Sequence, residues 1–180
     1  MRSFLISTAV AVGILSVHAQ ATEIVCPGDQ SNLNTYLEMT QILFNERQGA
    51  RASEYYADEF VSHNVDAGGL GTAVRTPDHM SRIWEHSERV SPDRQLINNL
   101  IICQGDLVVA RVTLKGTRIE GEMEGNPPNG RRFETSAIDI YRFKDGKVIE
   151  RWGNNDGIAM IRQLGLKTDL SMTPLDKNRD

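Results

Sequence analysis

Two short turn dipeptides, each set between runs of strand-forming residues, restrict the fold of this chain more than any other feature. Gly105-Asp106 separates QLINNLIICQ from LVVARVTLKGTR, and Asp145-Gly146 separates RRFETSAIDIYRF from KVIERWGN. Runs rich in β-branched and aromatic residues that are joined by such dipeptides are typical of β-hairpins. Residues 95–154 are therefore predicted to form consecutive antiparallel strands.

Helical patterns lie on both sides of this block of strands. Residues 31–49 carry apolar side chains at helical spacing, and residues 50–60 are expected to form a short helix that runs into a strand. Further helices are expected at residues 76–90 and 156–165, each with a capping residue at its start. This order indicates an α+β fold, in which about three helices pack against a curved antiparallel sheet.

A carboxylate stands in the middle of the predicted strand SAIDIYRF, residues 136–143. Because side chains alternate along a strand, Asp139 shares a face with Tyr141 and Phe143. Burial of a carboxylate costs free energy unless something compensates it. Asp139 is therefore either a general acid or base whose pKa is raised by poor hydration, or a structural group that accepts hydrogen bonds from a backbone amide or an arginine.

The partner of Asp139 depends on the register of the second hairpin. A two-residue turn places Glu150 opposite Tyr141 and Trp152 opposite Asp139, so that one face carries two carboxylates among aromatic side chains. This is the composition of a lined pocket. A bulge instead shifts the partner strand by one residue and brings Arg151 across, which turns Asp139 towards a salt bridge.

The opposite face of the same hairpin is also apolar, with Ile138, Ile140 and Ile149. A helix or a partner subunit must cover such a face. Because the helices are expected on the other side of the sheet, a homodimer is predicted.

The first 21 residues have the layout of a secretory signal peptide. Arg2 precedes a short apolar run, and Ala19 and Ala21 form an A-x-A arrangement, with cleavage expected after Ala21 or alternatively after Ala19. The mature protein is expected to be secreted or periplasmic. We predict one domain over residues 22–166 and a mobile polar tail over residues 167–180.

The chain has two cysteines, Cys26 and Cys103. In an oxidising compartment they are expected to form a disulfide, worth roughly 4 kcal/mol in the chain-entropy model. The alternative is that Cys103 is a small buried apolar residue and Cys26 a free thiol.

The formal net charge is −4 at pH 7, and the basic residues are scattered rather than clustered. Nucleic acid and membrane surfaces are therefore not expected as partners. The sequence has no metal-binding motif, no P-loop and no nucleophile elbow. We expect neither a metal nor an organic cofactor.

The segment GTRIEGEMEGNPPNGRRFETSAIDIYRFKDGKVIERWGNNDGIAMIRQLGL resembles the SnoaL-like polyketide cyclases of the nuclear transport factor 2-like superfamily. It carries the family's D-I-Y-R, D-G-K, E-x-W and Q-L-G elements, and the likeness extends more loosely over the mature chain. The resemblance implies a cone-shaped barrel with an internal cavity. In the cyclases, an aspartate that matches Asp139 acts as acid and base in an intramolecular aldol closure without a cofactor.

The resemblance also suggests other site residues. Some cyclases carry a histidine on the strand that matches DLVVARVTL, where this chain offers only Arg111 as a long polar side chain. His63, at the expected mouth of the cavity, is the candidate for the missing catalytic partner, and a structural or exposed position is the alternative. The candidate substrate-binding residues are Tyr56, Trp84, Arg111, Tyr141, Glu150 and Trp152.

Three functions remain open from the sequence. The first is a cyclisation, isomerisation, lyase or hydrolase step on a small carbonyl compound, with Asp139 as general acid and base. The second is non-catalytic binding of a small apolar or aromatic ligand by the same fold. The third is a role in protein interaction, with a vestigial cavity. A carboxylate that is clamped bidentately by Arg111 or Arg151 would argue against the first.

Overall fold

The structure, a computed structural model, describes residues 21–63, 71–121 and 127–166. Residues 1–20 of the predicted signal peptide and the predicted tail lie outside the described residues. The described strands are β1 Glu23–Val25, β2 Tyr56–His63, β3 Thr72–Arg75, β4 Gln95–Gln104, β5 Leu107–Thr117, β6 Arg132–Lys144 and β7 Lys147–Asn155. The helical segments are α1 Ser31–Met39, the π-helical η1 Thr40–Asn45, the 3-10 helix η2 Gly49–Glu54, α2 Pro77–Val90 and α3 Gly157–Leu164.

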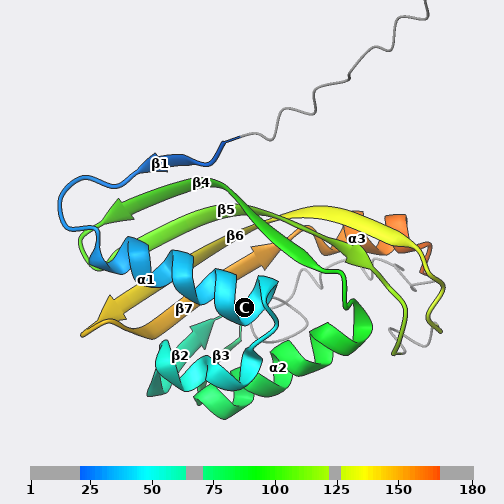
Figure 1. Cartoon of the computed structure of the whole chain (residues 1–180), viewed down its shortest axis with the longest axis horizontal. Coiled ribbons are helices and arrows are strands. Elements are labelled where there is room, and N and C mark those ends of the chain that lie inside the picture. Colours follow the sequence, from blue (N-terminus) through cyan, green and yellow to red (C-terminus); the bar gives the residue numbers. More distant parts are fainter. Residues whose placement is uncertain (1–20, 64–70, 122–126, 167–180) are drawn as a thin grey trace, which may run out of the picture.

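The strands form one sheet in the order β1-β4-β5-β6-β7-β2-β3. The hairpins predicted over residues 95–154 are present as the antiparallel neighbours β4 to β7. β1 pairs with β4 and β2 pairs with β7 in parallel, and each of these pairs is joined by a long connection, as parallel strands require. The sheet is therefore mixed rather than wholly antiparallel. The predicted α+β class is confirmed, and the curved sheet with its helices is visible in Figure 1.

Bulges in two of the antiparallel strand pairs accompany this curvature. Asn99 on β4 and Ile149 on β7 each have no partner in the register of the neighbouring strand, which marks a bulge at both positions. A bulge bends its strand and increases the local twist. Between β6 and β7, Asp145 and Gly146 have positive φ angles of 51° and 74°, as a two-residue hairpin turn requires.

The bulge at Ile149 decides which residues face Asp139. The predicted two-residue turn is present, with Lys144 opposite Lys147, but Asp139 lies opposite Gly153 and Tyr141 opposite Arg151. The prediction that Trp152 lies opposite Asp139 is therefore wrong. The extra residue shifts the rest of β7 by one position, which is the alternative that brings Arg151 across.

The helices cover one side of the sheet and one end of it (Figure 1). α1 crosses β5, α2 packs against η2 and β2, and α3 packs on β6. The side chain of Asn45 fixes the end of η1 to β4, since it both donates to the carbonyl oxygen of Leu96 (3.1 Å) and accepts from its amide (2.8 Å). At the other end, the Asp156 carboxylate caps α3 by accepting from the amide of Ala159 at 2.9 Å, as predicted.

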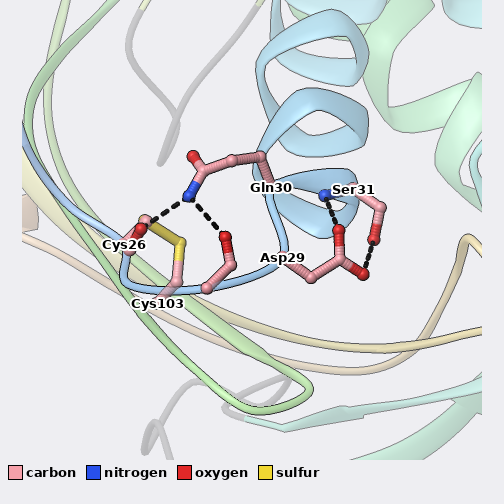
Figure 2. The surroundings of a disulfide bond; sticks show 6 residues. Cys26, Asp29, Gln30, Ser31 and Cys103 are labelled. Carbon is pink, nitrogen blue, oxygen red and sulfur yellow. Dashed lines mark hydrogen bonds between the residues drawn. A yellow bond between two sulfur atoms is a disulfide. The ribbon is translucent and has the colours of Figure 1, made fainter.

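The predicted disulfide between Cys26 and Cys103 is present, and its Cα atoms are 4.5 Å apart. Figure 2 shows how it ties the loop after β1 to β4. In the same loop, the Gln30 amide donates to the carbonyl oxygens of Cys26 (2.6 Å) and Gly28 (3.1 Å). The loop that leads into α1 is thus held by a covalent bond and by hydrogen bonds.

A disulfide fits an extracellular or periplasmic protein. Among the described residues, we find no helix with the length and apolar character needed to span a membrane.

Candidate active site

A cavity of about 680 Å³ lies between the inner face of the sheet and the helices. This volume is in the range that small-molecule sites occupy. One part of its wall is apolar and comes mainly from the helices and from β4 and β5. It includes Met39, Leu43, Phe44, Trp84, Leu96 and Leu114.

The polar part of the wall comes from β2, β6 and β7. Asp139 and Tyr141 point into the cavity from alternate positions of β6, as the sequence predicted, and Tyr56 of β2 joins them. Because of the bulge at Ile149, β7 contributes Arg151 and Gly153 to the same wall. The polar groups therefore gather at one side of an otherwise apolar cavity.

Asp139 is paired through only one of its carboxylate oxygens. Its Oδ1 accepts a hydrogen bond from Nη2 of Arg151 at 2.9 Å, whereas Oδ2 has no hydrogen-bond partner among the described residues. The Asp139 side chain is 13% exposed. This contact is not the bidentate clamp that would argue against an acid or base role.

Gly153 has no side chain, and the Asp139–Arg151 ion pair occupies the space that a side chain would fill. A Cβ atom at Gly153 would lie 2.7 Å from Oδ1 of Asp139 and 2.6 Å from Nη2 of Arg151. Both distances are shorter than van der Waals contact. A glycine opposite Asp139 is therefore required for the pair to form as it does.

Burial raises the pKa of Asp139 above its ordinary value, and the neighbouring Arg151 cation opposes part of this rise. Burial also raises the pKa of Tyr56 to about 12. The pKa of Tyr141 lies well above its ordinary value, because of burial and then of the nearby Asp139 carboxylate. Both tyrosines are therefore neutral hydrogen-bond donors at neutral pH.

Two buried uncharged donors in the cavity wall, besides the buried Nε of Arg151, have no partner within the described part of the chain. These are the hydroxyl group of Tyr56 and the indole Nε1 of Trp84. Buried polar groups are nearly always hydrogen-bonded in native proteins. Since both groups line the cavity, a ligand with acceptor oxygens would satisfy them.

The candidates His63, Glu150 and Trp152 lie on the opposite side of the sheet. They form, together with Arg142, a group that we call the outer-face cluster. Nε2 of His63 is 2.8 Å from Oε1 of Glu150, and its ring stacks on Trp152 with centroids 4.8 Å apart. Glu150 also accepts from Nε of Arg142 at 2.9 Å. The pKa of Glu150 is lowered, first by the hydrogen bond with His63 and also by Arg142.

None of the residues in the outer-face cluster lines the cavity, and Arg111 does not line it either. Arg111 lies opposite Ile138 on the exposed side of β5. Of the candidate residues, the structure therefore brings together Asp139, Tyr56, Tyr141 and Trp84. Glu150 pairs instead with Arg142.

The sequence reasoning missed several residues of the cavity wall. Thr40 lies at the start of η1, and its hydroxyl donates to the carbonyl oxygens of Tyr36 (3.0 Å) and Leu37 (3.1 Å), where the helix widens. Gly153 was also missed, although a glycine inside a strand often marks a close approach. Among the described residues, no three His, Cys, Asp or Glu side chains lie together as a metal site.

The sequence profile of the SnoaL-like polyketide cyclase family matches residues 34–164 of this chain. No curated protein sequence matches the chain significantly. Among solved structures, IdmH from Streptomyces antibioticus, described as a candidate polyketide cyclase, is 28% identical with a TM-score of 0.63, over 75% of this chain and 99% of IdmH.

AclR from Streptomyces galilaeus, described as a candidate hydroxylase, is 25% identical with a TM-score of 0.65, over 77% of this chain and 83% of AclR. TsrD from Streptomyces laurentii is 24% identical with a TM-score of 0.66, over 78% of this chain and 99% of TsrD. The likeness to TsrD is one of fold alone.

Proposed function

Because this chain belongs to the SnoaL-like polyketide cyclase family, we propose that it catalyses a cofactor-free reaction of a small carbonyl compound, with Asp139 as general base and general acid. The observation that carries the proposal is the Asp139 carboxylate in the cavity wall, with a raised pKa and one oxygen without a partner among the described residues. A carboxylate in such surroundings is a stronger base than one in water.

The proposed reaction begins when Oδ2 of Asp139 takes a proton from a carbon next to a carbonyl group. The electron pair of the broken C–H bond forms an enolate. In a cyclisation, the enolate carbon attacks a second carbonyl carbon of the same molecule, and the resulting alkoxide takes the proton back from Asp139. The proton and the electrons balance without an oxidant, a metal or an organic cofactor.

The cavity wall also offers groups that stabilise the enolate oxygen. The hydroxyl of Tyr56 is buried and faces the cavity, and its raised pKa keeps it protonated. A donor that is fixed before the reaction stabilises developing negative charge better than water does. Trp84 Nε1 can donate to a second oxygen of the same substrate.

The proposal is tested by incubating the mature protein, and separately Asp139→Asn, with an extract of the source cells in D2O. Mass spectrometry then follows every compound that is consumed or gains deuterium. The proposal expects a product of the same mass, or one that has lost water, with deuterium beside a carbonyl group, and only with the unmodified protein. If Asp139→Asn yields the same product at the same rate, Asp139 is not the base.

The Asp139–Arg151 pair favours a second candidate function, which is non-catalytic binding of the same kind of ligand. A carboxylate paired with a cation is stabilised in its ionised, weakly basic form. In this case both the unmodified protein and Asp139→Asn would enrich the same compound from the extract without changing it. IdmH and AclR share this fold but carry different candidate assignments, and a fold alone does not determine the reaction.

We also propose that the protein is exported and that its signal peptide is removed after Ala21. The layout of residues 1–21 and the Cys26–Cys103 bridge support this proposal. Mass spectrometry of the protein from the periplasm or the medium should then find Thr22, or Gln20 for the alternative cleavage, at the N-terminus. Recovery of the chain with residues 1–21 attached would contradict the proposal.

We further propose that two copies of the chain form a homodimer through the outer face of the sheet. Ile138 on this face is 50% exposed, and Ile102 of β4 is also an exposed large apolar residue. Sedimentation should find a dimer, and Ile138→Asp should shift it towards the monomer. A monomer for the unmodified protein would rule the dimer out.

A further inference from the structure

A second, smaller pocket of about 210 Å³ lies beside the main cavity. The C-terminal part of α2, strand β5 and helix α3 contribute to its wall, and so does Arg94, which precedes β4. Phe44 and Leu114 line both spaces, so the two adjoin. We call this space the Arg94 pocket.

The guanidinium group of Arg94 is buried and only partly hydrogen-bonded. The residue is 2% exposed, and Nη1 donates to the carbonyl oxygen of Trp84 at 3.0 Å. Nε and Nη2 are buried and have no hydrogen-bond partner among the described residues. Burial lowers the pKa of Arg94 to about 10, so the side chain is still a cation at neutral pH.

Aromatic rings compensate part of this buried charge. The guanidinium carbon lies 4.7 Å from the ring centroid of Phe44 and 5.7 Å from that of Trp84. Rings interact with the face of the guanidinium group and leave the N–H groups in its plane unsatisfied. A buried cation with unsatisfied donors is costly unless an anion joins it.

The side chains that line the pocket do not supply that anion: the carboxylate of Glu88 acts on Arg94 electrostatically, but it does not line the pocket and forms no ion pair with Arg94 among the described residues. No carboxylate is found among the described residues that line the Arg94 pocket, whereas Lys115 lines it with a second positive charge. Ser87 and Ser91 add hydroxyl groups, and the remaining wall is largely apolar. The pocket is therefore a local concentration of positive charge in a chain whose formal net charge is −4.

We infer that the Arg94 pocket binds the carboxylate group of a ligand whose apolar body fills the main cavity. Nε and Nη2 of Arg94 lie along one edge of the guanidinium group, which is the arrangement that receives the two oxygens of a carboxylate. The inference rests on the proposed use of the main cavity as a ligand site, and it narrows the substrate class to carbonyl compounds that carry an acidic group.

Two probes of nearly equal size and shape test the inference. 2-Naphthoate carries the carboxylate, and 2-naphthamide replaces it with a neutral amide. Titration calorimetry at pH 7 should find that the unmodified protein binds naphthoate about tenfold or more tightly than naphthamide, as expected for charge-assisted hydrogen bonds. Arg94→Gln should bind both probes equally, and Arg94→Lys should retain part of the preference.

Arg111→Gln serves as the control, because it removes one positive charge from an exposed position outside both spaces. It should keep the full preference for naphthoate. The titration measures binding and not turnover. A failure of the catalytic proposal would therefore leave the binding result intact, and the two can be told apart.

The midpoint of thermal unfolding, measured without ligand, shows whether each variant is folded. If Arg94 were only structural, Arg94→Gln would lower the midpoint of unfolding strongly, and naphthoate would show no advantage over naphthamide in the unmodified protein. Equal binding of the two probes, or no binding of naphthoate, would overturn the inference. Stabilisation by inorganic phosphate, without a preference for naphthoate, would overturn it too, since the pocket would then bind a free anion.

Discussion

Arg151 approaches Asp139 from the neighbouring strand through a single nitrogen, with Nη2 2.9 Å from Oδ1. The pair is thus geometrically distinct from the bidentate arginine clamps that hold a carboxylate in its ionised form. Burial raises the pKa of Asp139 while Arg151 works against the rise. The cation therefore lowers the pKa of Asp139 without occupying its second oxygen.

The first prediction concerns the pH dependence of turnover. In the proposed reaction Asp139 is a base only when it is ionised, so kcat/KM should fall as the pH drops through its pKa. In Arg151→Gln the cation that lowers this pKa is removed, and the acid limb of the pH profile should move to higher pH. A profile of kcat/KM against pH checks this shift. Arg142→Gln, in the outer-face cluster, is the control and should leave the profile in place.

The same variant makes a prediction for stability. The folded-state pKa of Asp139 is raised, so its protonated form favours the folded state at low pH, and this contribution is lost as the pH rises through that pKa. Without Arg151 the loss is larger. The free energy of unfolding of Arg151→Gln should therefore be lower than that of the unmodified protein by about 2 kcal/mol at pH 7 and by less in acid. Urea unfolding at several pH values measures it, and an equal difference at every pH would contradict this account.

The second prediction concerns Gly153, which leaves room for the ion pair. A methyl group in Gly153→Ala would meet both Oδ1 of Asp139 and Nη2 of Arg151, and the two side chains must move apart. We expect a loss of turnover of about tenfold or more, and a destabilisation of about 1–2 kcal/mol.

Gly157→Ala is the matched control for this change. The nearest atom to its new Cβ is Oδ1 of Asn155 at 3.6 Å, which is an ordinary contact. It should leave stability almost unchanged and, although Gly157 also lines the cavity, should lower turnover far less than Gly153→Ala, because its Cβ reaches neither Asp139 nor Arg151. Steady-state kinetics and thermal unfolding of the two variants, measured side by side, test the role of Gly153. Equal behaviour of the two would remove the argument for a required glycine.

The third prediction concerns the outer-face cluster. Glu150→Gln should leave ligand binding in the cavity unchanged, because Glu150 does not line it. Its pKa is lowered by His63 and Arg142, so its contribution to stability is present above the unfolded-state pKa and disappears as the pH falls through the folded-state pKa. The expected loss at pH 7 is about 0.5–1 kcal/mol. Urea unfolding at pH 7 and in acid, together with a binding titration, checks both statements.

The fourth prediction concerns the disulfide. The bridge joins residues that are 77 positions apart, and its removal in Cys26→Ser with Cys103→Ser should lower the free energy of unfolding by about 4 kcal/mol. Denaturant unfolding measures the change. The unmodified protein in the presence of a reducing agent is the control and should match the double variant. A large difference between the two would mean that the serines themselves disturb the loop after β1.

Much of the fold follows from local signals in the sequence. The hairpin turn at Asp145-Gly146 and the cap of α3 at Asp156 depend on conformations that those residue types favour, and the structure has both. The parallel pairing of β1 with β4 could not be predicted in this way. It joins segments that are far apart in the chain, and no local propensity specifies which edge of the sheet they reach.

The candidate site was predictable only in part, for a related reason. Asp139 and Tyr141 could be assigned to one face because they share a strand, and the cavity lies on that face. Glu150 and Trp152 could not be placed, because their face depends on a bulge that has no unique sequence signature. Arg94 gave no signal at all, since its burial results from the packing of α2 against the sheet.

Ile149 has no partner on β6, and this one-residue bulge determines which face of the sheet each following residue of β7 occupies. If Ile149 paired with Arg142, the residues after it would change sides, and Glu150 would replace Arg151 next to Asp139. The charged side chain of β7 beside Asp139 would then be an anion instead of a cation, without any substitution in the cavity wall. Deletion of Ile149, in contrast, would keep the following residues on their present sides. The side chains that surround Asp139 therefore depend on whether Ile149 is bulged out of the ladder as much as on the residue types in β7.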